Sequence, residues 1–269
     1  MIKEIYINTF DELMQLFNEQ QYIEKLGRYR SSYLYRGMSR TSYKMVTSLK
    51  RNCKDKQRLL EPAILKNFTK YASLNDPSLN DSIWKQMMAG QHHGLPTRLL
   101  DFTHSPLVAL HFAAVKDMED MDIEDCMVWR IDMAELHNQL PQRYRVMVDG
   151  SKSKTFTMNM LEEVVDSIEQ YDEDMGDHSM LIVEPSSIDE RIVNQYSFFA
   201  IVPSDMDDIE GFLDKYTDHT VKYIINKSLR WRIADTLDAY NISERLFYPG
   251  LDGLSAWIGR HYYVRDLED

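Results

Sequence analysis

Residues 106–115 have a helical pattern that is apolar around its whole circumference. They read Pro-Leu-Val-Ala-Leu-His-Phe-Ala-Ala-Val, with Ser105 placed to cap the first turn and Pro106 at the first helical position. A helix without a polar face has to be covered on all sides. A chain of 269 residues is long enough to build a core around such a helix. We therefore expect a helix that is buried between other layers.

Short strand and helix patterns are intermixed along the rest of the chain. We expect strands at residues 4–7, 32–37, 126–131, 180–183, 197–202 and 221–225. Helices are expected from Phe10 onward and over residues 55–71, 82–89, 227–240 and 251–258. Pro62 is a weak point of the helix at 55–71, and an extension of the helix at 82–89 to His92 is left open. Thr9 and Glu12 have the spacing of a capping box. No repeat or Gly/Ser-rich linker divides the chain. This predicts a single α+β domain, with mixed or antiparallel sheets and flanking helices, over residues 1–269.

The composition excludes several classes of protein. Two cysteines, Cys53 and Cys126, are too few for a disulfide scaffold or a multi-cysteine zinc ribbon, and we expect both to be reduced. The apolar stretches are shorter than the roughly 20 residues of a membrane span, and the first residues lack a signal-peptide pattern. We therefore expect a cytoplasmic protein that has no membrane partner.

The formal charge of −12 is unevenly distributed along the chain. Residues 21–60 contain eleven basic and two acidic side chains, whereas acidic residues gather at 117–125 and 162–177, where we expect solvated surface. A local positive potential attracts phosphate whatever the total charge, and arginine binds phosphate through two donors. The net charge disfavours nucleic acid as a partner. A small phosphate-bearing ligand in a local basic cleft fits the basic segment better.

The densest group of polar side chains lies at residues 91–105, directly before the apolar helix. Loops that carry many polar groups in such a position are often functional. Neighbouring residues such as His92 and His93 point apart, and no zinc-protease spacing is present, so we expect no metal site. The sequence also lacks a nucleophile elbow, a Walker loop and a Gly-x-Gly-x-x-Gly motif. No local motif identifies a reaction.

Two further groups of residues stand beside expected strands. Arg36 and Gly37 lie at a strand end inside the basic segment, where glycine allows close backbone approach. Arg191 and Gln195 come just before the strand expected at 197–202. For each group a structural role remains open, with the arginine bridging to an acidic loop and the glutamine bonding to backbone.

These groups together resemble the FRG-domain family, which is named for a Phe-Arg-Gly motif that here reads Tyr35-Arg36-Gly37. The family block Gln-His-x-Gly-Leu-Pro-Thr-Arg-Leu-Leu-Asp-aromatic-Thr-x-Ser-Pro is intact from Gln91 to Pro106. An Arg-Ile-x-x-Gln-x-x-x-Phe element matches residues 191–199, with Ser197 in place of an expected glycine, and residues 246–254 resemble the closing Phe-Pro-x-Leu-Asp-Gly-Leu. The resemblance covers about residues 33–258 and leaves 1–32 as a strand–helix extension.

The family layout is similar, more loosely, to that of the ADP-ribosyltransferases. In those enzymes a strand with Arg-Gly or His-Gly holds the nicotinamide side of NAD. A Ser-Thr-Ser-like strand then leads into an alanine-rich helix, and a later strand carries a catalytic glutamate. Arg36, Thr103 with Ser105, and Gln195 follow in this order here. The resemblance implies an ADP-ribosyltransferase-like fold.

The resemblance also implies NAD as a substrate and loss of nicotinamide through an oxocarbenium-like state that a carboxylate stabilises. Gln195 cannot supply the negative charge of that carboxylate. Glu184, Glu190 or Asp101 would have to replace it, and an inactive nucleotide-binding site fits the same residues.

The leading hypothesis is therefore an NAD-like nucleotide-binding domain, in a setting such as bacterial stress or phage defence. Its reactive residues would be Glu184, Gln195 and Asp101. The ligand would be bound by Arg36, Gly37, Gln91, His92, Arg98, Thr103, Ser105 and Arg191.

Two alternatives stay open. One is a non-enzymatic module that binds protein or nucleic acid through the basic residues 21–60. In the other, the central block is structural and Asp101 pairs with Arg98 or Arg36.

Overall fold

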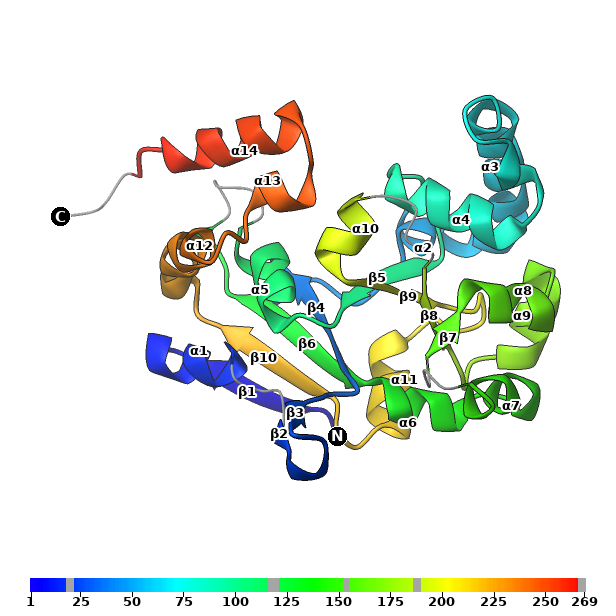
Figure 1. Cartoon of the computed structure of the whole chain (residues 1–269), viewed down its shortest axis with the longest axis horizontal. Helices are drawn as coiled ribbons and strands as arrows, with labels where there is room; N and C mark the ends of the chain where they lie inside the picture. The colour runs from blue at the N-terminus through cyan, green and yellow to red at the C-terminus, as the bar shows by residue number, and fades with distance from the viewer. Residues whose placement is uncertain (18–21, 116–120, 152–154, 186–189, 266–269) are drawn as a thin grey trace.

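The computed structural model describes residues 1–17, 22–115, 121–151, 155–185 and 190–265. Its strands are β1 (Lys3–Ile7), β2 (Tyr22–Ile23), β3 (Arg28–Tyr29), β4 (Tyr33–Met38), β5 (Leu99–Thr103), β6 (Cys126–Asp132), β7 (Phe156–Thr157), β8 (Leu181–Glu184), β9 (Ser197–Ile201) and β10 (Val221–Ile225). Eight of these form one sheet in the order β1-β10-β6-β4-β5-β9-β8-β7 (Figure 1). The pairs β1–β10 and β7–β8 are parallel and the other pairs are antiparallel. The predicted α+β class with a mixed sheet is confirmed.

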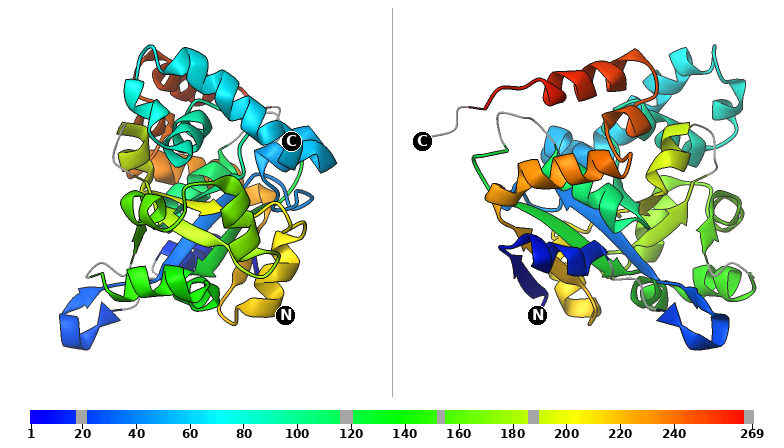
Figure 2. Two further views of the ribbon diagram at one scale, coloured as in Figure 1. Left: turned by 90° about the vertical axis from the view of Figure 1, so that its right-hand side faces the viewer. Right: turned by 60° about the vertical axis from the view of Figure 1, so that its left-hand side comes forward.

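Helices cover both faces of this sheet. They are α1 (Phe10–Phe17), α2 (Ser48–Cys53), α3 (Gln57–Ala72), α4 (Ile83–His92), α5 (Pro106–Ala114), α6 (Met133–Gln139), α7 (Gln142–Asp149), α8 (Met158–Val164), α9 (Ile168–Met175), α10 (Glu190–Gln195), α11 (Ile209–Tyr216), α12 (Arg230–Ala239), α13 (Glu244–Phe247) and α14 (Leu251–His261). The β2–β3 hairpin projects from the body as a separate two-stranded piece (Figure 2). Side-chain caps start several helices. Glu12 accepts hydrogen bonds from the Asn8 and Thr9 amides, and the Thr9 hydroxyl accepts one from the Glu12 amide.

Helix α5 is the buried apolar helix that the sequence predicts. Ser105 caps it by accepting a hydrogen bond from the Val108 amide, and Pro106 occupies its first turn. The helix packs against β4 at Gly37, where an added Cβ atom would lie 1.9 Å from the carbonyl oxygen of Ala109. The close approach that Gly37 allows is therefore the approach of a helix to a strand.

Three hydrophobic clusters hold the layers together. The first joins α1, α5 and α12 to β1, β10, β6 and β4, and it includes Tyr35. The second joins the helices α3, α4, α7, α8 and α9 to the strands β5, β8 and β9, and it includes Leu99 and Phe199. The third lies on the opposite face of the sheet, where side chains of β4, β5, β6, β8 and β9 pack with α6 and α11. The first and second clusters therefore cover neighbouring halves of one sheet face.

The structure corrects two expectations about the chain. Residues 99–103 of the polar block form the central strand β5, because Leu99, Leu100 and Phe102 are buried on the two sides of the sheet. The acidic run at 162–177 is not simply solvated surface, because it forms parts of α8 and α9 and its Asp172 is buried. The acidic run at 117–125 falls partly outside the described residues.

Cys53 and Cys126 are both free, as predicted. Among the described helices, none has both the length and the apolar character needed to cross a membrane.

Candidate functional site

A cavity of about 790 Å³ opens between the two clusters that share one face of the sheet. Tyr35 of the first cluster and Phe199 of the second both line it. Its wall is made by β4, β5, β9, α2, α5, α10, the end of α4 and the segments after β4 and α13. Six of the residues singled out from the sequence line this cavity together with Gly37: Arg36, Gln91, His92, Asp101, Thr103 and Gln195. Residues that are up to 159 positions apart therefore meet at one site.

Strands β4 and β5 separate at this site. Their only described pairing is Tyr35 opposite Thr103. Beyond that pair, Arg36 spans the gap and its Nη1 donates to the backbone oxygen of Asp101 at 2.7 Å. The same Nη1 lies 3.8 Å from the Asp101 carboxylate. Arg36 thus stands in for a ladder hydrogen bond while its side chain borders the cavity.

The guanidinium of Arg36 keeps an unused donor. Its buried Nε has no hydrogen-bond partner among the described residues. Burial lowers the pKa of Arg36 and the charge of Asp101 raises it, while the nearby charge of Arg51 lowers it further. The group stays protonated, since arginine retains its charge in proteins. A buried cationic donor without an acceptor is suited to hold an anion.

Asp101 is held by a short chain of hydrogen bonds. Gln91 Nε2 donates to Asp101 Oδ2 at 2.9 Å, and the Thr97 hydroxyl donates to Gln91 Oε1 at 2.6 Å. The Thr97 oxygen itself accepts the Leu99 amide at 3.1 Å, so its proton is directed to Gln91. This fixes which end of the Gln91 amide faces Asp101. Asp101 is exposed between buried neighbours of β5, and its carboxylate borders the cavity.

Gln195 reaches the cavity from the junction of α10 and β9. The Thr103 hydroxyl donates to the backbone oxygen of Gln195 at 2.7 Å, which ties this junction to β5. The next residue, Tyr196, has a positive φ of 49°, an uncommon conformation for a residue other than glycine. The turn brings Gln195 and Ser197 onto the same cavity wall.

Two predicted site residues do not line the cavity, and the side chain of a third is not described. The Ser105 hydroxyl caps α5, and Ser105 does not line the cavity. Glu184 is exposed at the end of β8 and also lies outside the cavity lining. Arg191 belongs to α10, but its side chain lies outside the described part of the structure.

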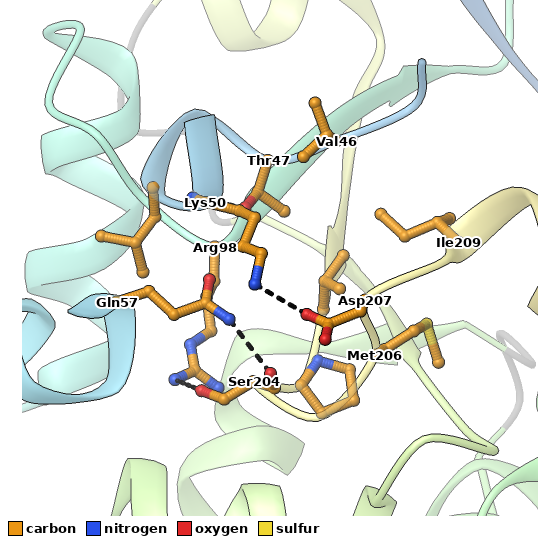
Figure 3. Close-up of a pocket in the computed structure, with 12 residues that line it drawn as sticks. Val46, Thr47, Lys50, Gln57, Arg98, Ser204, Met206, Asp207 and Ile209 are labelled. Carbon is orange, nitrogen blue, oxygen red and sulfur yellow. Dashed lines mark hydrogen bonds and ion pairs between the residues drawn. The ribbon is translucent and has the colours of Figure 1, made fainter. Parts of the chain in front are cut away.

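Arg98 does not reach the cavity either, although it lies in the same sequence block. Its side chain is buried, and it donates to Glu61 of α3 and Asp172 of α9, with Nε–Oε1 and Nη1–Oδ1 distances of 2.8 and 2.5 Å. Nη2 also donates to the Ser204 hydroxyl at 3.0 Å, beside a small separate cavity (Figure 3). Although burial alone would lower it, the two carboxylates raise the pKa of Arg98. Its position therefore indicates a structural role.

Eight of the eleven basic residues at 21–60 lie in three places. Lys25, Arg28 and Arg30 belong to or adjoin the projecting β2–β3 hairpin (Figure 2). Arg36, Lys44 and Arg51 line the large cavity. Lys50 and Arg58 form ion pairs with Asp207 and Asp205 at N–O distances of 2.8 and 2.9 Å. The segment therefore concentrates part of its charge at the cavity.

A possible metal-ligand group lies away from this cavity. Oxygen and nitrogen atoms of Asp132, Glu135 and His219 lie within 4.8 Å of one another. Glu135 accepts hydrogen bonds from His219 Nδ1 and from the amides of Asp218 and His219, and it raises the pKa of His219. These contacts explain the arrangement without an ion.

Sequence reasoning did not single out several residues that line the cavity. Lys44 and Arg51 were part of a general basic segment, and Phe112 and Tyr248 were assigned no role. The one feature of the sequence that could have indicated the cavity is Asp101. A carboxylate at a strand position whose neighbours are buried apolar residues indicates an opening in the core at that point.

The fold and the cavity define an α+β protein with a polar site at the centre of one mixed sheet. Residues 31–122 match the FRG domain family, so the chain carries an FRG domain. The matched range includes Arg36, Gly37 and the block from Gln91 to Pro106. Neither a curated protein nor a solved structure matches the chain.

Proposed function

We propose that the large cavity binds a phosphate-bearing nucleotide of the NAD type. The observation that carries the proposal is the convergence of Arg36, Gln91, Asp101 and Gln195 on one cavity. Strands β4, β5 and β9, which the resemblance to ADP-ribosyltransferases associates with NAD, are neighbours in the sheet. A volume of about 790 Å³ suits a ligand of this size.

The side chains at the cavity divide into suitable roles. Arg36 supplies a cationic donor for phosphate or ribose oxygen, and Gln195 with Thr103 supplies polar groups at the opposite strand. Phe112 and Tyr248 add aromatic surface on which a base or a nicotinamide ring can rest. Asp101 is the carboxylate at the cavity, and it takes the role that Gln195 cannot perform.

In the proposed reaction, the glycosidic bond between nicotinamide and the ribose C1′ breaks and its electron pair leaves with nicotinamide. The negative charge of Asp101 stabilises the oxocarbenium-like state at C1′. Water or an acceptor side chain then forms the new bond to C1′ and loses a proton. The hydrogen bond from Gln91 holds Asp101 in place for this role.

Replacing Arg36 with glutamine should weaken NAD binding by about 10- to 100-fold, because a charge-assisted donor to the ligand is lost. Isothermal titration of NAD and ADP-ribose into the wild-type chain and the variant measures this. Arg58→Gln is the matched control, since Arg58 lies in the same basic segment but pairs with Asp205 on the surface. Absence of binding to the wild-type chain, or equal affinity in Arg36→Gln, contradicts the proposal.

Asp101→Asn should lower the release of nicotinamide from NAD at least tenfold while NAD binding is largely retained. The asparagine keeps the shape of the side chain and removes its charge. Chromatography of the products at saturating NAD measures the rate. Glu184→Gln is the comparison, because Glu184 lies outside the cavity lining. If turnover disappears in Glu184→Gln and persists in Asp101→Asn, the carboxylate has been assigned wrongly. If the wild-type chain binds NAD without turnover, the site is a binding site only.

A further inference from the structure

Three cationic side chains from separate parts of the fold line the large cavity. Arg36 comes from β4, Lys44 from the loop that follows it, and Arg51 from α2. Asp101 is the one carboxylate among the described lining residues, and it lies 3.8 Å from Arg36. Lys44 and Arg51 form no ion pair with the described residues, whereas Lys50 between them in sequence pairs with Asp207. The cavity therefore carries an excess of positive charge.

Bringing these like charges together has an electrostatic cost. Arg51 lies close enough to Arg36 for its charge to act against that of Arg36. The buried Nε of Arg36 also lacks an acceptor among the described residues. Like charges that converge on one cavity, together with an unused donor, favour an anion that carries more than one negative charge.

The loop that carries Lys44 is held in place by hydrogen bonds. Glu124 accepts the Ser42 amide at 2.6 Å and the hydroxyls of Thr41 and Ser42 at 3.0 Å. On the other side of Lys44, the Met45 amide donates to Glu210 at 2.8 Å. Because both flanks of Lys44 are fixed, little ordering of the backbone is needed when an anion binds.

We propose that Arg36, Lys44 and Arg51 form a subsite for the pyrophosphate group of the ligand. This inference rests on the proposed nucleotide site and adds the residues that select for a pyrophosphate, so that nucleoside diphosphates and dinucleotides bind in preference to nucleoside monophosphates. A pyrophosphate spreads its charge over two phosphates and can meet all three cations. A pyrophosphate offers these three cations more acceptor oxygens and more negative charge than a single phosphate does.

The test compares the affinities of four probes: ADP-ribose, AMP, adenosine and inorganic pyrophosphate. For the wild-type chain we expect ADP-ribose to bind at least tenfold more tightly than AMP, and adenosine to bind most weakly. Lys44→Gln and Arg51→Gln should each weaken ADP-ribose about tenfold and the double variant more, with a smaller effect on adenosine. Arg58→Gln, which removes an equal charge outside the cavity, should change the affinities less than twofold.

The outcomes separate this inference from the nucleotide site. If ADP-ribose binding depends on Arg36 but not on Lys44 or Arg51, the pyrophosphate subsite is wrong and the nucleotide site stands. Equal affinities for AMP and ADP-ribose also overturn the subsite. If inorganic pyrophosphate binds in a manner that requires Lys44 and Arg51 while no nucleotide binds, the subsite stands and the nucleotide site fails. Thermal unfolding of each variant should match the wild type, since neither side chain has a described ion pair.

Discussion

Gly37→Ala should destabilise the protein by about 3 kcal/mol or more, which corresponds to a fall in Tm of roughly 6–12 °C. The added Cβ would lie 1.9 Å from the Ala109 carbonyl oxygen and 2.6 Å from the Ala113 backbone nitrogen. Both atoms belong to the backbone of α5, so no side chain can rotate away to make room. The whole helix would have to move from β4, and it carries part of the first hydrophobic cluster with it.

The control for this effect is Gly259→Ala in α14. An added Cβ at Gly259 meets nothing within 4 Å, and alanine is the better helix former by about 1 kcal/mol. We therefore expect Gly259→Ala to be neutral or slightly stabilising in thermal or urea unfolding. Equal transitions for Gly37→Ala and the wild type would show that α5 does not pack on β4 as described.

Arg98→Met should cost about 3–5 kcal/mol of unfolding free energy, because it leaves the carboxylates of Glu61 and Asp172 buried without their cation. The loss should shrink as the pH falls from 7 to 5. Without Arg98, the two buried carboxyl groups favour their neutral forms in the folded state, so proton uptake stabilises the folded variant relative to the unfolded chain. Urea unfolding at several pH values measures both effects.

Arg58→Met is the control for Arg98→Met, since Arg58 lies on the same stretch of α3 as Glu61 and its ion pair with Asp205 is exposed. We expect it to change stability by at most about 1 kcal/mol. Arg98→Lys should recover only part of the loss, because a lysine cannot serve both carboxylates with the planar fork of a guanidinium. If Arg98→Met instead kept its stability and lost nucleotide binding, Arg98 would belong to the ligand site after all.

Much of the fold could be predicted from local patterns. The buried helix at 106–115, the strand at 197–202 and the capping box at Thr9 each rest on interactions within a few residues. The strand at 99–103 was harder to recognise, since Asp101 interrupts its apolar residues. Its burial depends on β4 and β9, which lie far away in sequence.

The sequence alone could not predict that the candidate site residues meet at one cavity. Arg36 and Gln195 meet because β5 lies between β4 and β9, and this strand order is not encoded in any one segment. The structural role of Arg98 could not be predicted from the sequence either. Its partners Glu61 and Asp172 lie 37 and 74 residues away, and nothing in the central block distinguishes Arg98 from Asp101 as a residue of the site.

The block at residues 91–105 contains both structural residues and residues that line the cavity. A relative that shares this block can therefore share the fold without sharing the chemistry of the cavity. Arg98 and Leu99 support the core, whereas Gln91 and Asp101 border the cavity. Selection for folding alone would preserve the first pair, while the second pair could change along separate lineages. The part of the chain that matches the FRG domain, residues 31–122, contains residues of both kinds. A comparison of chemistry among relatives should ask which of them keep an acid at the position of Asp101.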